Sequence, residues 1–339
     1  MSDPTTPAPT SDPVLAADDL TVTFPVGRRQ LTAVDSVSLS VSRGETLALV
    51  GESGSGKTTT ALAMIRAIPV DSGTVVFDGA DITNHTERQL KAVRRRLQIV
   101  LQDPYASLDP RMTVGKIVAE PLKAHRLGTR QEIADTVAAT LEQVGLPADA
   151  ASRYPGQFSG GQRQRISIAR ALVLRPSVIV ADEPVSALDV SIQAQIIGLL
   201  ADLQAAENLA YLVIAHDLAL VHHIADRVAV MYLGRIVEEG PVDAVVGDPQ
   251  HPYTAALLSA TPTTSADRRE RIVLGGEPPS PISKPTGCAF HPRCPAAVER
   301  CRVENPALTN TDAGSHRVAC FFPGSVASGL TIGTSGGRP

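Results

Sequence analysis

Short apolar runs separated by amphipathic stretches make up the pattern of hydrophobic and polar positions in most of the chain. Alternating polarity at residues 14–24 and 31–41 predicts two strands joined by a turn. Residues 46–50 and 177–181 are compact, mainly apolar runs, typical of parallel strands buried on both faces. Because strand and helix signals alternate along the chain, the pattern predicts an α/β fold.

The middle of the chain carries a helical pattern instead. Residues 113–145 have helical periodicity with breaks expected at Pro121 and Gly128, and strand signals resume only at 177–181. The pattern therefore predicts a helical subdomain at about residues 103–175, inserted in the α/β domain. We also expect a hairpin turn at Asp78-Gly79, helices at 192–204 and 218–225, a strand at 210–215, a hairpin around Gly234 and a short helix at 253–259.

The length of the chain, 339 residues with 43% hydrophobic, allows one large domain with appendages. Residues 1–13 are rich in Ser, Thr and Pro, and we expect them to form a disordered leader. The main domain is expected at 14–248, and a Pro-rich, loop-rich extension at 249–322. The Gly/Ser/Thr-rich residues 323–339 are expected to be disordered.

A glycine-rich stretch lies between the apolar run at 46–50 and an apolar-periodic segment at 61–68. It matches G-x-x-x-x-G-K-[ST] in a strand–loop–helix context, where backbone N–H groups and a helix N-terminus surround phosphate oxygens. Lys57 would add charge at the terminal phosphates and Thr58 would ligate Mg²⁺. A P-loop for ATP is thus predicted, formed by Gly51, Ser53, Gly54, Ser55, Gly56, Lys57, Thr58 and Thr59.

Two adjacent acids, Asp182 and Glu183, end the apolar run at 177–181. A metal-bound triphosphate needs a carboxylate near Mg²⁺, and hydrolysis needs a base that orients water. We assign the first role to Asp182 and the second to Glu183. Simple termination of a strand by polar residues is the alternative interpretation.

A second serine–glycine sequence, Ser159-Gly160-Gly161-Gln162, begins a strongly helical run. It has the character of another anion cradle at a helix N-terminus. A triphosphate already bound by Lys57 hardly needs a second cradle from the same chain. We therefore expect this sequence to serve a nucleotide held by another copy or by a related chain.

Composition argues against a nucleic-acid-binding surface, because aromatic residues are only 3% of the chain, Trp is absent and the net charge is −4. No apolar run approaches the length needed to span a bilayer, and the acidic N-terminus resembles neither a signal nor a transit peptide. We expect a cytoplasmic protein whose membrane role, if any, requires partner subunits.

Several motifs together resemble those of ATP-binding cassette (ABC) ATPases. Phe158 to Gln162 is similar to the family's signature, with Phe where Leu is commoner. Gln102 resembles the Q-loop, Ser186-Ala187-Leu188-Asp189 the D-loop, and His216 the switch histidine. The motifs occur in the family's order, and the resemblance covers roughly residues 14–248.

This resemblance implies a RecA-like P-loop core with a helical subdomain, dimerising head-to-tail around two ATP molecules. Gln102 would contact Mg²⁺ and sense the γ-phosphate, and His216 would hold the hydrolytic geometry. Glu183, His216 and Gln102 are thus the expected catalytic residues, while Asp189 and the signature residues complete the ATP site. Phe24 is a candidate for stacking on adenine, although packing alone explains it as well. His222 and His223 match no motif and are expected on a helix surface.

Finer matches resemble the oligopeptide/dipeptide importers. They are the segment from Gln102 to Arg111, the segment from Asp182 to Gln195, and His251-Pro252-Tyr253-Thr254 before a Cys-containing end. Gln162 in the signature is closer to the F-type ATPase subunit. The resemblance implies a transport-coupled ATPase at the cytoplasmic face of the membrane, with a sibling ATPase, two permeases and an extracytoplasmic binding protein. The solute is expected to be a peptide, with a nickel chelate or glutathione as alternatives.

The cysteines Cys288, Cys294, Cys301 and Cys320 cluster near the C-terminus. Their spacing is looser than that of usual zinc modules, and disulfides are disfavoured in a reducing cytosol. Four thiolates suit a [4Fe–4S] cluster, and members of the resembling subgroup with such a tail are linked to one. Zn²⁺ and four free thiols are the alternatives, with His291 and His316 as further possible ligands.

Two other functions remain to be weighed. A soluble ABC ATPase acting on DNA or ribosomes usually carries paired cassettes or long coiled-coil insertions, and this chain has neither. A non-catalytic nucleotide switch typically loses Glu183 or His216, and both are present. An ABC importer ATPase is therefore the favoured prediction.

Overall fold

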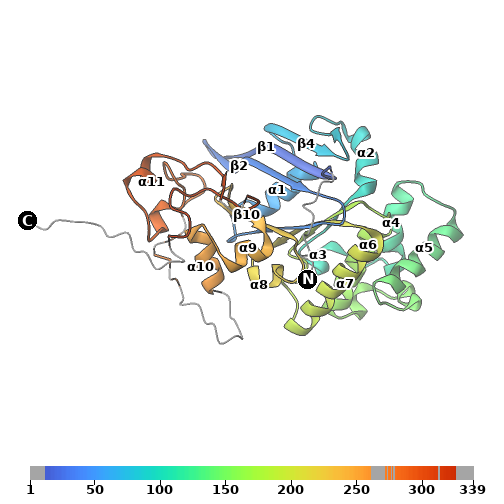
Figure 1. Cartoon of the computed structure of the whole chain (residues 1–339). Coiled ribbons are helices and arrows are strands. Elements are labelled where there is room, and N and C mark those ends of the chain that lie inside the picture. Colours follow the sequence, from blue (N-terminus) through green and yellow to red (C-terminus); the bar gives the residue numbers. More distant parts are fainter. Residues whose placement is uncertain are drawn as a thin grey trace, which may run out of the picture.

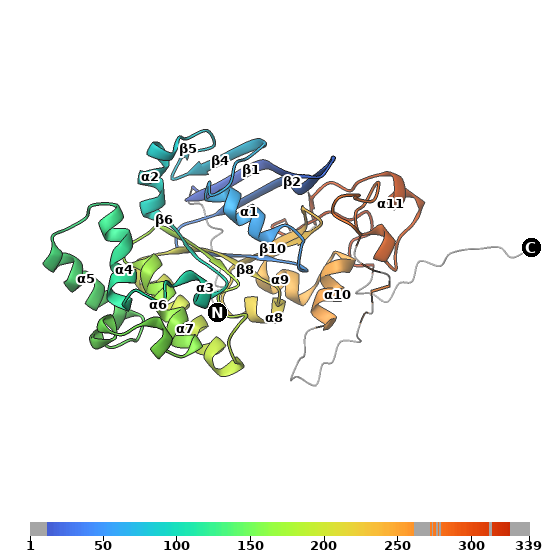
Figure 2. The same cartoon turned by 180° about the vertical axis from the view of Figure 1, so that it is seen from behind.

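The computed structural model describes residues 12–260, 272, 274–275, 277, 279–311 and 314–325. Within this part of the chain, strands form two sheets, and helices pack around them (Figures 1 and 2). Most of the predicted leader and tail lies outside the described residues. In Figure 1 the helical subdomain and the C-terminal extension lie at opposite ends of the molecule.

The larger sheet has the order β11-β12-β10-β9-β3-β8-β7-β6 among the described residues. Its centre is parallel, since β3 pairs with both β8 and β9, and β7 pairs with β8 and β6. Every residue of β3, β7 and β8 is buried, which explains why these strands are almost entirely apolar, apart from Thr46 at the start of β3 and Asp182 at the end of β7. The bounds are β3 Thr46–Val50, β6 Leu97–Val100, β7 Val178–Asp182, β8 Ala210–Ala215, β9 Arg227–Tyr232, β10 Arg235–Pro241, β11 Thr309–Asn310 and β12 Arg317–Val318.

The smaller sheet is antiparallel and has the order β2-β1-β4-β5. It comprises β1 (Leu15–Val26), β2 (Arg29–Val41), β4 (Ser72–Phe77) and β5 (Ala80–Asp81). The predicted turn at Asp78-Gly79 joins β4 to β5, and both of its residues have positive φ, as a tight hairpin requires. The helix α2 (Glu87–Arg96) follows and leads into β6.

The helical subdomain is built mainly from α4 (Val114–Ala124), α5 (Arg130–Gln143) and α6 (Gly160–Leu172). The expected break at Gly128 is present, but the one at Pro121 is wrong, because Pro121 lies inside α4. Burial of Val114, Ile117, Val118 and Leu122 holds α4 together despite the hydrogen bond that Pro121 cannot donate. The shorter elements are α3 Pro104–Ser107, η1 Ala148–Ser152 and η2 Pro155–Gln157.

Along the chain, the helix α7 (Val190–Glu207) precedes the strand β8, and the helix α8 (Leu218–Val221) follows it. The predicted helix at 218–225 is thus shorter than expected, and hydrogen-bonded turns continue it to Ala225. His222 lies in these turns and contacts Asp243, its Nε2 lying 2.9 Å from Oδ1. The predicted hairpin around Gly234 is the β9–β10 pair.

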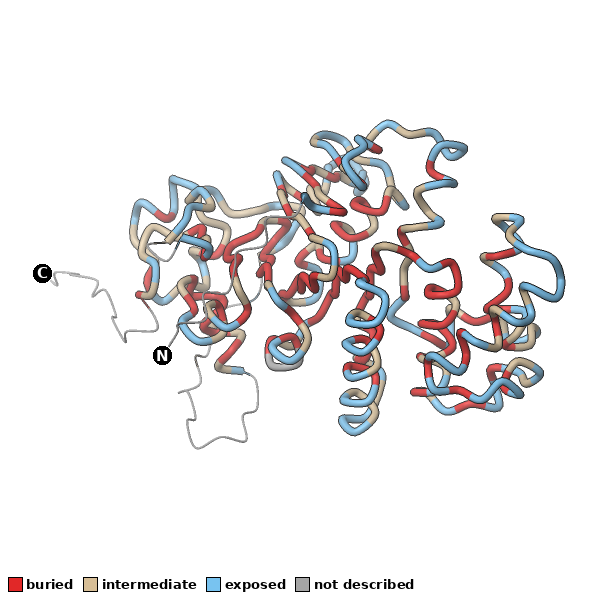
Figure 3. Tube along the Cα trace, turned by 45° about the vertical axis from the view of Figure 1, so that its right-hand side comes forward, coloured by how far each residue is buried: buried red, intermediate tan, exposed pale blue. Residues whose placement is uncertain are grey.

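The C-terminal extension joins the main sheet through β12, which pairs with β10. It contains α10 (Pro252–Ala260), η3 (His291–Arg293) and α11 (Glu299–Val303), whereas α9 (Val242–Gly247) ends the main domain. A hydrophobic core that combines Val228, Val230 and Tyr232 of the main domain with Tyr253 and Phe290 fastens it there. Figure 3 shows the buried residues running as one band through the centre of the molecule into this region.

Candidate functional site

The P-loop connects the buried strand β3 to α1 (Lys57–Met64). Two of its glycines are required by close backbone contacts. A Cβ at Gly51 would lie 2.2 Å from the Met231 carbonyl oxygen, and one at Gly56 would lie 2.3 Å from that of Ala33. The loop is therefore pressed against the β2 and β9 regions, and no larger residue fits at these positions.

The side chain of Lys57 folds back onto the backbone of this loop. Its Nζ donates to the carbonyl oxygens of Gly51, at 2.8 Å, and Glu52, at 2.9 Å, and the residue is only 6% exposed. Burial lowers the pKa of Lys57, while the nearby carboxylates of Glu183, Asp182 and Glu52 oppose that shift. The arrangement holds one ammonium group at the predicted phosphate site.

Thr58 and Asp182 meet at the carboxyl edge of the parallel sheet. The Thr58 hydroxyl donates to Asp182 Oδ1 at 3.2 Å, and Asp182 is buried at the end of β7. Burial raises the pKa of Asp182, and the hydrogen bond from Thr58 opposes the rise. Mg²⁺ binds one or two carboxylates with phosphates and water as further ligands. Two oxygen donors so placed beside the P-loop fit this ion.

The three residues expected to act in hydrolysis converge beside this point. Gln102 Nε2 donates to Glu183 Oε2 at 2.7 Å, and His216 Nδ1 lies 3.6 Å from the same oxygen. Glu183 has a φ of 44°, a left-handed conformation that is uncommon for a residue with a side chain. The strained turn after β7 thus directs the carboxylate of Glu183 toward the ends of β6 and β8.

The signature residues cap α6. Ser159 Oγ accepts from Gln162 N at 3.4 Å, and Gln162 Oε1 accepts from Ser159 N at 3.0 Å, forming a reciprocal capping box. A Cβ at Gly161 would lie 2.5 Å from a methyl carbon of Ile192, so this loop packs against α7. Within the described part of the chain, no hydrogen bond or ion pair joins the signature to residues 51–59.

The remaining predicted ATP-site residues are divided among the start of α7, the end of β1 and the P-loop. Asp189 is exposed and caps α7, accepting from Ile192 N at 3.1 Å. The Ser191 hydroxyl is the main cause that lowers the pKa of Asp189. Phe24 lies near the end of β1 and is 37% exposed. Ser55 Oγ is buried without a hydrogen-bond partner among the described residues, whereas Ser53 is exposed and Thr59 is half-buried in the first turn of α1.

Two further residues contact the P-loop, and the sequence analysis did not predict them. The backbone N–H of Glu52 donates to Tyr253 Oη at 2.7 Å, and Arg293 forms a two-pronged ion pair with the Glu52 carboxylate. Both belong to the C-terminal extension. The only signal in the sequence was the His251-to-Thr254 motif, which indicated a subgroup and no contact.

The four cysteines line one small cavity together with Phe290 and His291, and all four are free thiols. Burial raises the pKa of Cys288, that of Cys294 to about 12 and that of Cys320 to about 11. Among the described residues, no group of three or more His, Cys, Asp or Glu is placed to hold a metal ion.

The predicted iron–sulfur cluster is therefore not supported, and neither is zinc. Burial in this largely apolar cavity is the main cause that raises the pKa of Cys294. Of the two histidines considered as ligands, His316 Nε2 lies 2.7 Å from Glu238 Oε1 and His291 Nδ1 lies 2.9 Å from the Cys288 carbonyl oxygen.

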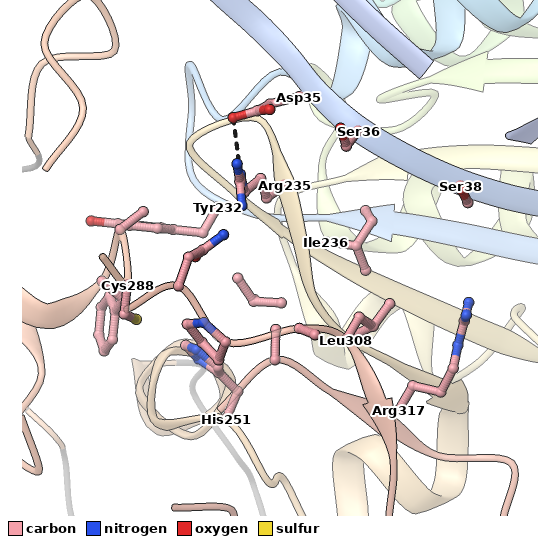
Figure 4. A pocket seen from close by; sticks show the side chains of 17 residues that line it. Asp35, Ser36, Ser38, Tyr232, Arg235, Ile236, His251, Cys288, Leu308 and Arg317 are labelled. Carbon is pink, nitrogen blue, oxygen red and sulfur yellow. Dashed lines mark hydrogen bonds and ion pairs between the residues drawn. The ribbon is translucent and has the colours of Figure 1, made fainter. Parts of the chain in front are cut away.

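A larger cavity, of about 480 Å³, lies where the extension meets β2 and β10 (Figure 4). Asp35 and Arg235 form an ion pair at its edge, and His251, Cys288 and Arg317 belong to the extension. The cavity thus marks the contact between the extension and the main domain. No helix in the described part of the chain is long and apolar enough to cross a membrane.

Residues 34–186 match the family described as ABC transporter. Among solved structures, a dimer of the ATP-binding cassette MJ0796 with ADP and phosphate is 28% identical, with a TM-score of 0.62, covering 67% of this chain and 98% of that one. CbiO1 from Clostridium perfringens is 26% identical with a TM-score of 0.64, covering 70% of this chain and 92% of that one. The fold and the P-loop site thus define an ATPase subunit of an ABC transporter.

The particular family follows from the extension and the full-length relatives. Residues 237–301 match the C-terminal region of oligopeptide/dipeptide transporters. The oligopeptide transport ATP-binding protein AppF of Bacillus subtilis is 52% identical, covering 86% of this chain and 89% of that one. The dipeptide transport ATP-binding protein DppF of Haemophilus influenzae is 49% identical, covering 91% and 96%. The chain belongs to the ATP-binding proteins of the oligopeptide/dipeptide ABC transporter family.

Proposed function

We propose that this protein hydrolyses ATP to drive the import of peptides across a membrane. The observation that carries the proposal is the convergence of Glu183, Gln102 and His216 next to the P-loop and the Thr58–Asp182 pair. The similarity to AppF and DppF, which are named for oligopeptide and dipeptide transport, supports peptides as the solute. A nickel chelate or glutathione would need only different partner subunits.

Each residue takes one role in this proposal. The P-loop and Lys57 bind the phosphates, Glu183 orients a water molecule and accepts its proton, and His216 contacts the γ-phosphate. Thr58, Asp182 and Gln102 would hold Mg²⁺, which neutralises charge on the phosphates when bound. Phe24 would stack on the adenine ring. Gln102 immediately precedes the helical subdomain, so its hydrogen bond to Glu183 connects the start of that subdomain to the base.

The signature residues and Asp189 would serve an ATP molecule bound by a second ATPase chain. Support comes from the packing of the signature loop against α7 and from its lack of a hydrogen bond to its own P-loop among the described residues. The solved structure of the ATP-binding cassette MJ0796 is a dimer. We propose a sibling ATPase as the second chain, with a homodimer as the alternative.

The partners proposed beyond this dimer are two permease subunits and an extracytoplasmic binding protein. They would place the chain at the cytoplasmic face of the membrane. We also propose the division into a leader at 1–13, an ATPase domain at 14–248, an extension at 249–322 and a tail at 323–339. The strand β12, which joins the extension to the main sheet, falls within the third segment.

Metal binding by the four thiols is a separate hypothesis that the function does not need. Their location around one cavity supports it, and the lack of a three-residue ligand group among the described residues opposes it. Anaerobic purification followed by elemental analysis and absorption spectroscopy decides the matter. Four iron atoms per chain with a brown colour would indicate a cluster, and one zinc per chain would indicate the other ion.

The Glu183→Gln variant tests the ATPase proposal. Loss of the base is expected to lower kcat at least about 100-fold, while ATP affinity changes less than about twofold. The measurements are phosphate release and equilibrium binding of ATP, with Glu299→Gln as control because Glu299 is an exposed carboxylate of the extension. Normal turnover in Glu183→Gln would remove Glu183 from its role.

The transport proposal is tested by isolating a tagged chain from its own membranes and identifying the proteins bound to it. We expect a second ATPase chain and two permeases. Recovery of DNA or ribosomal proteins in their place would favour the soluble ABC ATPase instead.

A further inference from the structure

The C-terminal extension holds the P-loop at Glu52 through two contacts. Tyr253 Oη accepts the Glu52 backbone N–H at 2.7 Å. The two terminal nitrogens of Arg293 donate to the two carboxylate oxygens of Glu52, at 2.8 and 3.1 Å. We infer that the extension completes the ATP site, with Tyr253 and Arg293 as positioning residues that set the conformation and charge of the P-loop.

The Arg293–Glu52 pair is partly removed from water, which makes it stronger than a pair on the surface. The side chain of Arg293 is only 8% exposed, and that of Glu52 is 32% exposed. Two parallel hydrogen bonds between a guanidinium and a carboxylate also fix the orientation of both groups. The pair therefore constrains Glu52 from its side chain, while Tyr253 constrains it from its backbone.

The Arg293–Glu52 pair also affects the charge around the proposed triphosphate site. Glu52 is the second residue of the P-loop, and its carboxylate is near enough to Lys57 to oppose the lowering of the lysine pKa. An unpaired carboxylate here would repel the phosphates of ATP and compete for Lys57. Arg293 neutralises that carboxylate and holds it on the side of the extension.

The tyrosine is rigidly placed by a cluster of rings. Tyr253 is fully buried, and its ring centroid lies 4.7 Å from that of Tyr232 and 5.5 Å from that of Phe290. The Tyr253 backbone N–H donates to His251 Nδ1 at 3.1 Å. Because ring and backbone are both fixed, Tyr253 Oη presents a preformed acceptor to the loop.

The β9–β10 hairpin holds the P-loop at a second point, Ser55, and the extension also contacts this hairpin region. Gly234 N donates to the Ser55 carbonyl oxygen at 2.8 Å, and Asp35 N donates to that of Gly234 at 2.9 Å. The Asp35 carboxylate in turn accepts from Lys284 of the extension at 3.1 Å and from Arg235 at 2.9 Å. Figure 4 shows Asp35 and Arg235 at the contact between the extension and the main domain. The extension thus contacts the loop directly at Glu52 and supports it at Ser55 through the hairpin.

This inference rests on the proposed ATPase function, and steady-state ATP hydrolysis by the full-length chain in its transporter complex tests it. Arg293→Ala and Tyr253→Phe are each expected to raise KM for ATP about fivefold, since each removes a hydrogen-bonding group of typical net strength. The kcat should change less than about twofold, because neither residue lies beside Glu183. Arg300→Ala is the matched control, since Arg300 forms an exposed ion pair with Glu304 in the same extension.

A second substitution separates positioning from simple loss of structure. Glu52→Gln, added to Arg293→Ala, removes the carboxylate that Arg293 neutralises, and is expected to recover at least half of the lost ATP affinity. A purely structural role predicts the opposite, because the double variant lacks both partners of the pair. If Arg293→Ala does not fold, Tyr253→Phe decides, because it removes one oxygen and keeps the ring.

Unchanged KM in the folded variants would overturn the inference, as would a further loss of affinity in the double variant. These results differ from failure of the proposed function, in which the unsubstituted complex itself would not hydrolyse ATP.

Discussion

Acidification is expected to loosen the C-terminal extension through His251. This residue is buried, with an exposure of 2%, and its Nδ1 accepts the Tyr253 N–H at the start of α10. Burial lowers the pKa of His251 to about 4, and the Glu238 carboxylate only partly opposes the shift. The folded protein therefore keeps His251 neutral under conditions in which the unfolded chain binds a proton.

The sign and size of the effect follow from this difference. A histidine in the unfolded chain has a pKa of about 6.5, so stability is complete above that value and falls as the pH drops from about 6.5 toward about 4. Between pH 7.5 and 5 the linkage relation gives a loss of about 2 kcal/mol, and the full difference is about 3 kcal/mol.

Denaturant unfolding of the full chain at several pH values measures this loss, with His251→Asn as the comparison. Asparagine is a favourable residue at a helix N-terminus and can still accept the Tyr253 N–H, but it does not titrate. The unfolding free energy of the variant should fall by about 2 kcal/mol less than that of the unsubstituted protein between pH 7.5 and 5. Parallel curves for the two proteins would refute the reasoning.

Two other substitutions test the local structure. Gly51→Ala is expected to abolish ATP binding, because the new Cβ would lie 2.2 Å from the Met231 carbonyl oxygen and displace the P-loop; normal affinity in an equilibrium binding measurement would contradict this. Thr129→Ala removes the capping box of α5 and is expected to lower the unfolding free energy by about 1 kcal/mol without changing KM for ATP. Thermal unfolding and ATPase assays check the second, and an unchanged melting temperature would count against the cap.

The main-domain fold was readable from the sequence because its signals are local. Buried parallel strands such as β3 and β7 are runs of almost entirely apolar residues, and the glycine turn at Asp78-Gly79 indicates a hairpin. The prediction failed at Pro121, where burial of α4 outweighed the helix-breaking tendency of proline. Tertiary packing thus overrode a local preference.

The sequence by itself determined which residues would carry the chemistry, since the P-loop, the acids after β7 and the signature are contiguous motifs whose spacing encodes a local shape. Only the tertiary structure decided what surrounds them. The contact of Tyr253 and Arg293 with Glu52 joins residues more than 200 positions apart. No periodicity or spacing records such a pairing, because it depends on where the packing of Tyr232, Tyr253 and Phe290 brings the extension.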